Sequence, residues 1–239
     1  MRRMHIKVIN PNTTKSMTAL IGECARAAAG PGVTVEAVGV RRGPAAIESH
    51  ADDALALPGV LEEIIKGEAA GCDGYVIACF GDPGLKAARE LARGPVVGIA
   101  EAGMRTAAYL GRGFSVVTTL SRTAGHARDL AEEYGVARQC LGIHACEIPV
   151  LEIGTDPLAR VAILRTCEEA LAADGADAIV LGCAGMADLC EDLSAELGVS
   201  VVDGVAAATI AVEGLLRMRL VTGKRGEFAQ PPTRTAVRA

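Results

Sequence analysis

Val76-Ile77-Ala78-Cys79-Phe80-Gly81 and Val180-Leu181-Gly182-Cys183-Ala184-Gly185 are two versions of one local pattern, and they decide how this chain is expected to fold. In each copy an apolar run leads to a cysteine, a glycine follows two residues later, and a helix-like stretch comes next. This order places each thiol where a buried strand passes into a helix. A chain that repeats the arrangement can hold two sulfur atoms face to face across a cleft between its halves.

Apolar, β-rich runs alternate with helical patterns along the whole chain, which is typical of parallel sheets covered by helices. We therefore expect an α/β fold of two pseudo-symmetric lobes, each with a four-stranded parallel sheet, and an active site in the cleft between them. The predicted strands are Ile6–Ile9, Val33–Val40, Tyr75–Cys79, Val96–Ala100, Phe114–Leu120, Glu147–Leu151, Ala178–Cys183 and Val199–Val202.

The spacing of matched segments indicates an internal duplication. Cys79 and Cys183 are 104 residues apart, and the strands that open at Val96 and Val199 are 103 residues apart. The predicted first lobe comprises residues 1–95 together with 206–239, and the second comprises residues 96–205. The apolar run Val205–Leu216 is expected to form a helix that returns to cover the first lobe.

Three further helices are predicted from capping signals and periodicity. One spans residues 13–29, with Asn12 or Thr13 as its N-cap. Another runs from Asp156-Pro157 to about Gly175. A third covers the apolar positions from Leu57 to Ile65, where Pro58 predicts either a kink or the start of the helix. From Thr222 onward the chain becomes polar, and we expect a mobile or surface-draped end.

Composition excludes several classes of function. The chain of 239 residues is 50% hydrophobic and carries a net charge of −5, which gives no reason to expect nucleic acid or an anionic membrane as a partner. No apolar stretch reaches the roughly 18 residues of a membrane span, and no signal-peptide pattern follows the start. The eight cysteines are scattered, so we expect free thiols in a reducing, cytoplasmic environment.

The paired cysteines suit proton transfer to and from carbon. Only a thiolate can accept a proton, and backbone N–H groups at the start of a helix stabilise that anion. After Cys79, Asp82 is expected to cap the next helix with Pro83 in its first turn. Cysteine is often a packing residue, and we assign that role to the six without a duplicate, namely Cys24, Cys72, Cys140, Cys146, Cys167 and Cys190.

Polar residues at a second pair of strand ends are candidates for substrate binding, because ligands of open α/β sheets gather at the carboxyl ends of strands. Asn12 follows the first strand, and Thr118 and Thr119 follow its counterpart in the second half. The alternative is that Asn12 and Ser121 only cap helices. Residues 47–49, Ile-Glu-Ser, offer a further wall of the cleft.

Metal, nucleotide and hydrolase signatures are absent from the sequence. No Cys-x-x-Cys occurs, and Gly111-Arg112-Gly113 precedes a strand rather than following one. The histidines show no spacing that pairs one of them with Cys79 or Cys183; they are His5, His50, His126 and His144. We therefore predict no metal site and no bound nucleotide.

Four motifs resemble the hydantoin racemases of the aspartate/glutamate racemase superfamily, and the similarity covers nearly the whole chain up to the tail. They are Ile-Asn-Pro-Asn-Thr-Thr at 9–14, Cys-Phe-Gly-Asp-Pro-Gly at 79–84, Val-Val-Thr-Thr at 116–119 and Gly-Cys-Ala-Gly-Met at 182–186. The resemblance implies two α/β halves, two catalytic cysteines (Cys79 and Cys183), no cofactor and a homo-oligomer. Allantoin racemases resemble the chain equally well.

The chain departs from the superfamily directly after each cysteine. Aspartate and glutamate racemases place Asn-Thr there to hold a carboxylate, whereas this sequence has Phe80-Gly81 and Ala184-Gly185. Backbone N–H groups and an aromatic ring suit an uncharged ring carbonyl, which favours a cyclic amide over a free amino acid.

The leading hypothesis is cofactor-independent racemisation of 5-monosubstituted hydantoins, a class to which allantoin belongs, by two-base proton transfer at C5. Cys79 and Cys183 would exchange protons with C5, while the substrate would contact Asn12, Phe80, Gly81, Thr118, Thr119, Ala184 and Gly185. Two alternatives remain open. The first is a related isomerase or decarboxylase of a small diacid, and the second is a non-catalytic protein that binds small ligands.

Overall fold

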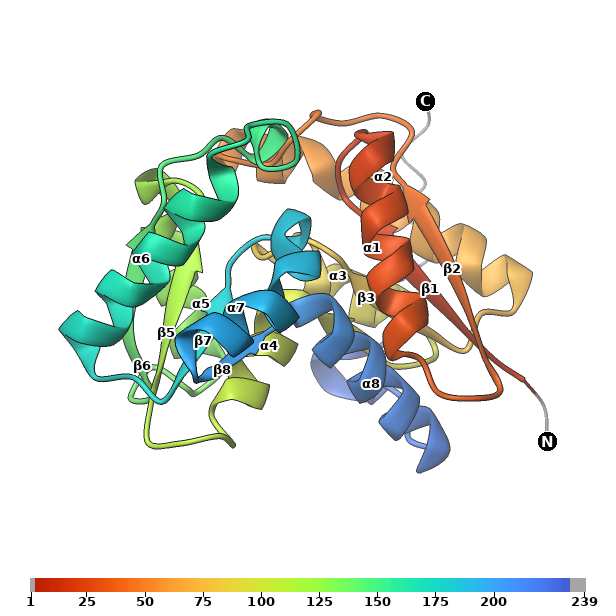
Figure 1. Cartoon of the computed structure of the whole chain (residues 1–239). Helices are drawn as coiled ribbons and strands as arrows, with labels where there is room; N and C mark the ends of the chain where they lie inside the picture. Colours follow the sequence, from red (N-terminus) through yellow and green to blue (C-terminus); the bar gives the residue numbers. More distant parts are fainter. Residues whose placement is uncertain (1–2, 233–239) are drawn as a thin grey trace.

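The computed structural model describes residues 3–232 and contains two four-stranded parallel sheets (Figure 1). The strands of the first sheet are β1 (Met4–Asn10), β2 (Val33–Gly39), β3 (Gly74–Ile77) and β4 (Val96–Gly98), and those of the second are β5 (Phe114–Thr118), β6 (Cys140–Ala145), β7 (Ala178–Leu181) and β8 (Ser200–Val202). Their orders, β2-β1-β3-β4 and β6-β5-β7-β8, are the same. The predicted α/β fold with two matched sheets is confirmed.

The central strands bring the predicted site residues to one edge of each sheet. In the first sheet Ile9 of β1 pairs with Ile77 of β3, so the segments leading to Asn12 and Cys79 leave side by side. In the second sheet Val117 of β5 pairs with Leu181 of β7, which brings Thr118 and Cys183 together in the same way. Parallel pairing therefore gathers residues far apart in sequence at the carboxyl ends of the strands.

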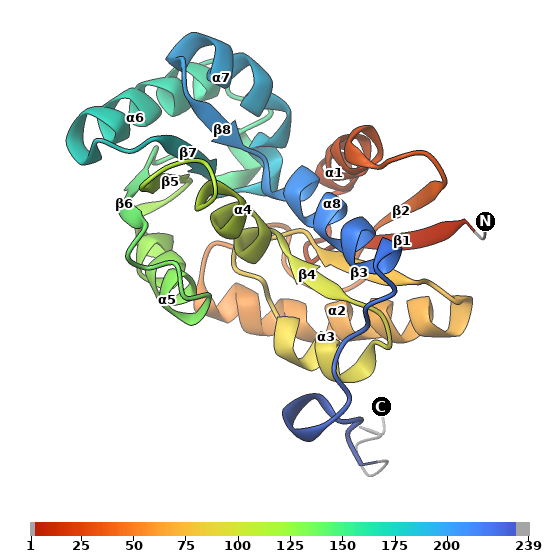
Figure 2. The ribbon, with the colours of Figure 1, turned by 90° about the horizontal axis from the view of Figure 1, so that it is seen from below.

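Helices cover both sheets, and two of them join the halves. The α-helices are α1 (Lys15–Ala28), α2 (His50–Ala70), α3 (Leu85–Leu91), α4 (Ile99–Ala107), α5 (Ala124–Glu133), α6 (Ala159–Asp174), α7 (Cys190–Leu197) and α8 (Gly204–Arg217). Short 3₁₀ helices are η1 (Ser121–Thr123), η2 (Val150–Glu152), η3 (Ala184–Leu189) and η4 (Gly226–Phe228). Helices α4 and α8, which follow the last strand of each sheet, pack against each other between the two halves (Figure 2).

Helix α8 is the helix predicted over Val205–Leu216. Asp203 caps it, because its carboxylate accepts hydrogen bonds from the amides of Val205 and Ala206. The helix packs against α1 and the strands β1, β3 and β4 of the first sheet. These contacts place α8 on the sheet of the first half, and the assignment of residues 206–239 to the first lobe stays a prediction.

Two predictions about strands are wrong. The strand expected at Glu147–Leu151 lies earlier, as β6 over Cys140–Ala145. It is an edge strand of mixed composition, so its sequence lacks the apolar run that marks a central strand. Ile148 and Val150 are instead buried from a loop and from η2. The predicted lobe boundary at residue 96 also assigned Val96–Gly98 to the second half, whereas β4 pairs with β3 of the first sheet.

Helix α2 begins eight residues before Pro58 and continues through it, so the expectation that the proline marks the start or a kink missed most of the helix. Its N-terminus is set by Ser49, whose side chain accepts from the amide of Asp52. Proline removes the bond to the carbonyl four residues earlier. Ala54 and Pro58 are both exposed, so water can hydrogen-bond that carbonyl.

The other predicted helices are present with shifted starts. Helix α1 begins at Lys15 after Thr14, and α6 begins at Ala159, one turn later than expected from Asp156-Pro157. Gly175 ends α6 in the left-handed conformation at φ 63°, which glycine adopts without strain.

The described part of the predicted tail lies on the first half. Thr222 donates a hydrogen bond to the carbonyl of Gly94, and the Lys224 ammonium donates to the carbonyls of Arg89 and Glu90 at the end of α3. A cation at this position satisfies carbonyls that the helix leaves without partners. Residues 233–239 of the tail lie outside the described residues.

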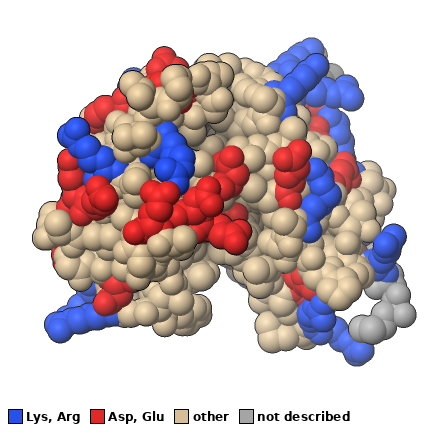
Figure 3. All heavy atoms as spheres, in the orientation of Figure 1, with Lys and Arg blue, Asp and Glu red and all other residues tan. Residues whose placement is uncertain are grey.

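The distribution of charged side chains on the surface is consistent with the net charge of −5. Figure 3 shows Asp and Glu side chains gathered over α7 and no continuous Lys and Arg surface on this face. Within residues 3–232, no helix combines the length and apolar character needed to cross a membrane.

Candidate active site

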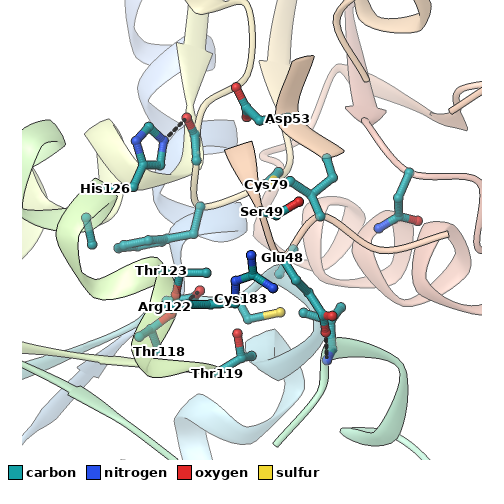
Figure 4. Close-up of a pocket in the computed structure, with 18 of the residues that line it drawn as sticks. Glu48, Ser49, Asp53, Cys79, Thr118, Thr119, Arg122, Thr123, His126 and Cys183 are labelled. Atoms are coloured by element: carbon teal, nitrogen blue, oxygen red, sulfur yellow. Dashed lines mark hydrogen bonds between the residues drawn. The ribbon is translucent and has the colours of Figure 1, made fainter. Parts of the chain in front are cut away.

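A cavity of about 190 Å³ lies between the two halves, and both Cys79 and Cys183 line it. Figure 4 shows the two side chains entering from opposite sides, Cys79 from the segment after β3 and Cys183 from the segment after β7. Each thiol lies at the carboxyl end of a strand next to the centre of its sheet. The structure therefore brings together the two residues that the repeated motif singled out.

The two cysteine loops have the same hydrogen bonds. The carbonyl of Cys79 accepts from the amide of Asp82 at 2.9 Å, and that of Cys183 accepts from the amide of Met186 at 3.1 Å. Each sulfur also accepts from the amide two residues later, Gly81 in the first loop and Gly185 in the second. The chain thus presents both sulfurs on matching turns, as expected for a duplicated unit.

Burial determines the protonation of both thiols. It raises the pKa of Cys79 to about 12, with further increases from the charges of Cys183, Asp53 and Asp82. Burial likewise raises the pKa of Cys183 to about 11. The amide hydrogen bonds lower both pKa values but do not offset burial. The predicted stabilisation of the thiolates by backbone N–H groups is therefore present, but burial has the larger effect on both pKa values.

Most of the residues predicted to contact substrate line the cavity, namely Asn12, Phe80, Gly81, Thr118, Thr119 and Ala184. Gly185 does not line it, although a Cβ at that position would lie 3.6 Å from the sulfur of Cys183. The side-chain oxygen of Asn12 accepts from the amide of Thr14 at 2.9 Å in the turn before α1. The N-cap of α1 is Thr14, which makes no side-chain capping bond, so the prediction that Asn12 or Thr13 caps this helix is wrong.

The site also contains polar side chains that no sequence pattern predicted. They come from the start of α2 and from the segment that leads into α5, and they are His50, Asp53, Arg122, Thr123 and His126. Glu48 and Ser49, suggested as a further wall, also line the cavity. The Ser49-x-x-Asp52 spacing is a capping signal that could have located the start of α2, and with it His50 and Asp53, at the cleft.

Two loops meet across the cleft through Glu48. Its carboxylate accepts a hydrogen bond of 2.6 Å from the amide of Val150, which also lines the cavity. The contact joins the segment after β2 to the segment after β6. One wall of the cavity is therefore built from both halves of the chain.

Histidines do lie near Cys79, although no sequence spacing predicted it. The Nε2 atom of His126 lies 3.2 Å from the carbonyl oxygen of Gly81, and the ring of His50 packs edge-on against that of His126 at 5.7 Å. Burial raises the pKa of Asp53, which lines the same part of the cavity, and the two histidines lower it. This end of the cavity is polar and carries several titratable groups.

Asp82 has a different role from the one predicted. Helix α3 begins only at Leu85 after Gly84, and the Asp82 carboxylate points instead to the start of α4. It accepts hydrogen bonds from the amides of Ala100 and Glu101 at 3.0 and 2.9 Å. The backbone of Asp82 has φ 45°, a conformation that a non-glycine residue adopts only when its surroundings hold it there.

A cluster of potential metal ligands lies at the opposite end of β1 from the cavity. It consists of His5, Glu36 and Cys72, and Nε2 of His5 lies 3.1 Å from the carboxylate of Glu36. The ammonium of Lys7 lies 3.8 Å from the same carboxylate, so a positive charge already occupies this region. The group has no contact with the candidate site.

Comparison with known proteins identifies the family. A family model described as Asp/Glu/Hydantoin racemase matches residues 6–212. The hydantoin racemase of Rhizobium meliloti is 47% identical, covering 98% of this chain and 97% of that protein. The structure of allantoin racemase from Klebsiella pneumoniae matches with a TM-score of 0.95 at 50% identity, covering 97% of this chain and 95% of that one.

A second solved structure, allantoin racemase from Pseudomonas fluorescens, matches with a TM-score of 0.92 at 37% identity, covering 98% of this chain and 100% of that one. These similarities extend through both sheets and both cysteine loops. The resemblance inferred from the four motifs is confirmed, and the chain belongs to the Asp/Glu/Hydantoin racemase family.

Proposed function

We propose that this protein racemises 5-monosubstituted hydantoins, allantoin among them, by transferring protons between C5 and two cysteines without a cofactor. The observation that carries the proposal is the entry of Cys79 and Cys183 into one cavity from opposite sides. Inversion at a carbon requires a base on one face and an acid on the other. The similarity to hydantoin and allantoin racemases over nearly the full chain supports the choice of ring.

The reaction needs the two sulfurs in opposite protonation states. One thiolate removes the C5 proton and becomes a thiol, while the opposing thiol protonates the other face and becomes a thiolate. The charge of Cys183 raises the pKa of Cys79, so a second negative charge in the cavity is disfavoured. One thiolate and one thiol is therefore the favoured arrangement once a single proton has left.

Backbone amides are available for the enolate oxygen that forms at C4. In both loops the amide two residues after the cysteine donates a hydrogen bond to the sulfur. The amide three residues after the cysteine donates to the carbonyl of the cysteine. Within the described chain the amides of Phe80 and Ala184, directly after the cysteines, have no hydrogen-bond acceptor. We assign them as donors to the negative charge that develops on this oxygen in the enolate, which is common to both directions of the reaction.

The test is polarimetry of several enantiopure 5-substituted hydantoins, including allantoin, in buffer free of metal ions and pyridoxal phosphate. Wild-type protein should abolish the optical rotation, and Cys79→Ser and Cys183→Ser should each lower the rate by at least ~10³-fold, because a hydroxyl is a much weaker acid than a thiol. Cys140→Ser, which changes a thiol outside the cavity, is the matched control. Near-wild-type racemisation by Cys183→Ser would disprove the two-base scheme.

Exchange of the C5 proton in D₂O separates the two faces. Each serine variant should retain exchange with one enantiomer, and the two variants should prefer opposite enantiomers. Incubation with maleate and with an arylmalonate tests the other reactions open to this fold, and product formation there without activity on hydantoins would reject the proposal. The homo-oligomer and the cytoplasmic location expected from the sequence stay predictions.

A further inference from the structure

The cavity contains a buried carboxylate oxygen with no partner. Among the described residues, Oδ1 of Asp53 is the one buried side-chain nitrogen or oxygen atom without a hydrogen bond. Buried polar atoms are nearly always paired, because leaving one unpaired costs about 1–3 kcal/mol. A polar group kept in this state beside a ligand cavity indicates that the missing partner is supplied by the ligand.

The helix start alone does not explain why the Asp53 oxygen is unpaired. Asp52 and Asp53 both lie in the first turn of α2, where an acidic side chain interacts favourably with the helix dipole, so the dipole does not distinguish them. The Asp52 carboxylate accepts hydrogen bonds from the Ser49 hydroxyl and from the amide of Glu48. Asp53 makes no such bond, and it lines the cavity instead.

The position of Asp53 relates it to the reacting carbon. A Cβ on Gly81 would lie 3.4 Å from Oδ1 of Asp53, so the carboxylate packs directly against the loop that carries Cys79. The charge of Asp53 also raises the pKa of Cys79, which reflects the short distance between the two groups. Figure 4 shows Asp53 and Cys79 on the same side of the cavity, opposite Cys183.

The chemistry of a hydantoin ring offers two N–H donors, N1 and N3. N1 is bonded to C5, whereas N3 is separated from it by the C4 carbonyl. With C5 between the two sulfurs, a carboxylate beside Cys79 is nearer to N1. A small rotation about χ2, a broad torsion in aspartate, turns either oxygen toward the cavity.

We propose that Asp53 is a substrate-binding residue that accepts a hydrogen bond from the N1–H of the hydantoin ring, so that the site selects rings with an unsubstituted N1. The proposal rests on the function proposed above and names a specificity determinant within the same site. The ring N–H would supply the partner that the buried oxygen lacks.

The experiment is a double-mutant cycle by calorimetry with ligands that cannot react because C5 carries no hydrogen. The probes are 5,5-dimethylhydantoin, its N1-methyl derivative and its N3-methyl derivative, each titrated into wild-type protein and Asp53→Ala, which has no side-chain acceptor for a ring N–H. Hydrogen bonds to a charged group contribute about 1.5–3 kcal/mol, so the substitution should weaken 5,5-dimethylhydantoin roughly 10- to 100-fold. It should change the affinity of the N1-methyl derivative less than about threefold, because that ligand has no N1–H to lose.

Several outcomes would overturn the assignment. Equal losses of affinity for all three ligands would mean that Asp53 has a structural role. An unchanged affinity for the N3-methyl derivative, together with a loss for the N1-methyl derivative, would mean that the carboxylate binds N3–H and not N1–H. Urea unfolding gives a second readout: Asp53→Ala should unfold at the same or higher urea concentration, and a large loss of stability would again indicate a structural role. Wild-type binding without racemisation of any 5-monosubstituted hydantoin would reject the proposed function while leaving the Asp53 assignment standing on the binding data.

Discussion

The Tyr134 hydroxyl donates a hydrogen bond of 2.6 Å to the carboxylate of Asp82, three residues beyond Cys79 in the chain. Tyr134 follows α5 in the second half, whereas Asp82 belongs to the loop of the first cysteine. The same carboxylate also accepts from two amides at the start of α4. The turn that presents Cys79 is thus fixed from the other half of the molecule, and the position of one sulfur depends on contacts between the halves.

Removing the Tyr134 hydroxyl should destabilise the protein. Tyr134→Phe leaves a buried carboxylate with two donors instead of three, and loss of one partner of a buried, charged hydrogen bond costs about 1–3 kcal/mol. We expect a lower urea midpoint with an unchanged slope. Racemisation should also slow, because the Cys79 turn is less firmly held.

Tyr109→Phe is the matched control, since the Tyr109 side chain is 87% exposed. It should leave both the urea midpoint and the rate unchanged. Equal stability of Tyr134→Phe and Tyr109→Phe would show that the bond between the halves contributes nothing.

Asp82 should make the stability depend on pH in an unusual direction. Burial raises the pKa of Asp82 to about 6 from its ordinary value of 3.8, although Tyr134 and the amides of Glu101 and Ala100 lower it. The folded state therefore holds this proton more tightly than the unfolded state does. The contribution to the free energy of unfolding is largest below pH 3.8, falls as the pH rises to about 6, and is constant above that.

Asp82→Asn isolates this contribution, because the amide does not titrate while keeping an oxygen for the α4 amides. The difference in free energy of unfolding, wild type minus variant, should decrease by up to ~3 kcal/mol between pH 4 and pH 7. A difference that increases over the same range would mean that the carboxylate is stabilised, not penalised, by its surroundings.

The sequence predicted the parts of the fold that depend on local pattern. Strands β3 and β7 are buried on both faces, so nearly all of their residues are apolar. The cysteine motif marks the place where each strand ends. The edge strand β6 contains Gly142 and His144 and is only partly buried, so its composition did not distinguish it from a loop. Edge position alone does not explain why β6 was missed, because the edge strands β2, β4 and β8 were predicted from their apolar runs.

The site was predicted where the motif repeats and missed where it does not. Cys79 and Cys183 lie in copies of one pattern, but His50, Asp53 and His126 come from two helices that the chain brings together only in three dimensions. Their roles have no signature in spacing, because no fixed sequence distance separates a helix of one half from a loop of the other. The sequence could not predict the raised pKa values of the two thiols either, because burial is their main cause.

Alkylation should show that both cavity cysteines are protonated at neutral pH. Burial raises the pKa of Cys79 to about 12 and that of Cys183 to about 11, and only the thiolate reacts with iodoacetamide. Mass spectrometry of the two peptides should give rates that rise about tenfold per pH unit up to pH 10. A rate that levels off by pH 8 for Cys79 would mean a thiolate stabilised in the free protein.

Added 5,5-dimethylhydantoin should slow the modification of Cys79 and Cys183 together, because both line one cavity. Cys24 is also partly exposed but does not line the cavity, and its rate should be unaffected.

Gly98, at the end of β4, should not tolerate a side chain. A Cβ at this position would lie 2.1 Å from Cγ of Asp82, so Gly98→Ala must displace the carboxylate from the start of α4. Overpacking alone costs about 1–3 kcal/mol, and the lost hydrogen bonds of a buried charge add to it.

Gly125→Ala in α5 is the control: no atom lies within 4 Å of its Cβ position, and alanine favours a helix by up to about 1 kcal/mol over glycine. Urea unfolding should therefore move in opposite directions for the two variants, and because Asp82 follows Cys79 in the same turn, only Gly98→Ala should also slow racemisation. A wild-type rate and midpoint for Gly98→Ala would mean that the Asp82 contact does not position the first cysteine.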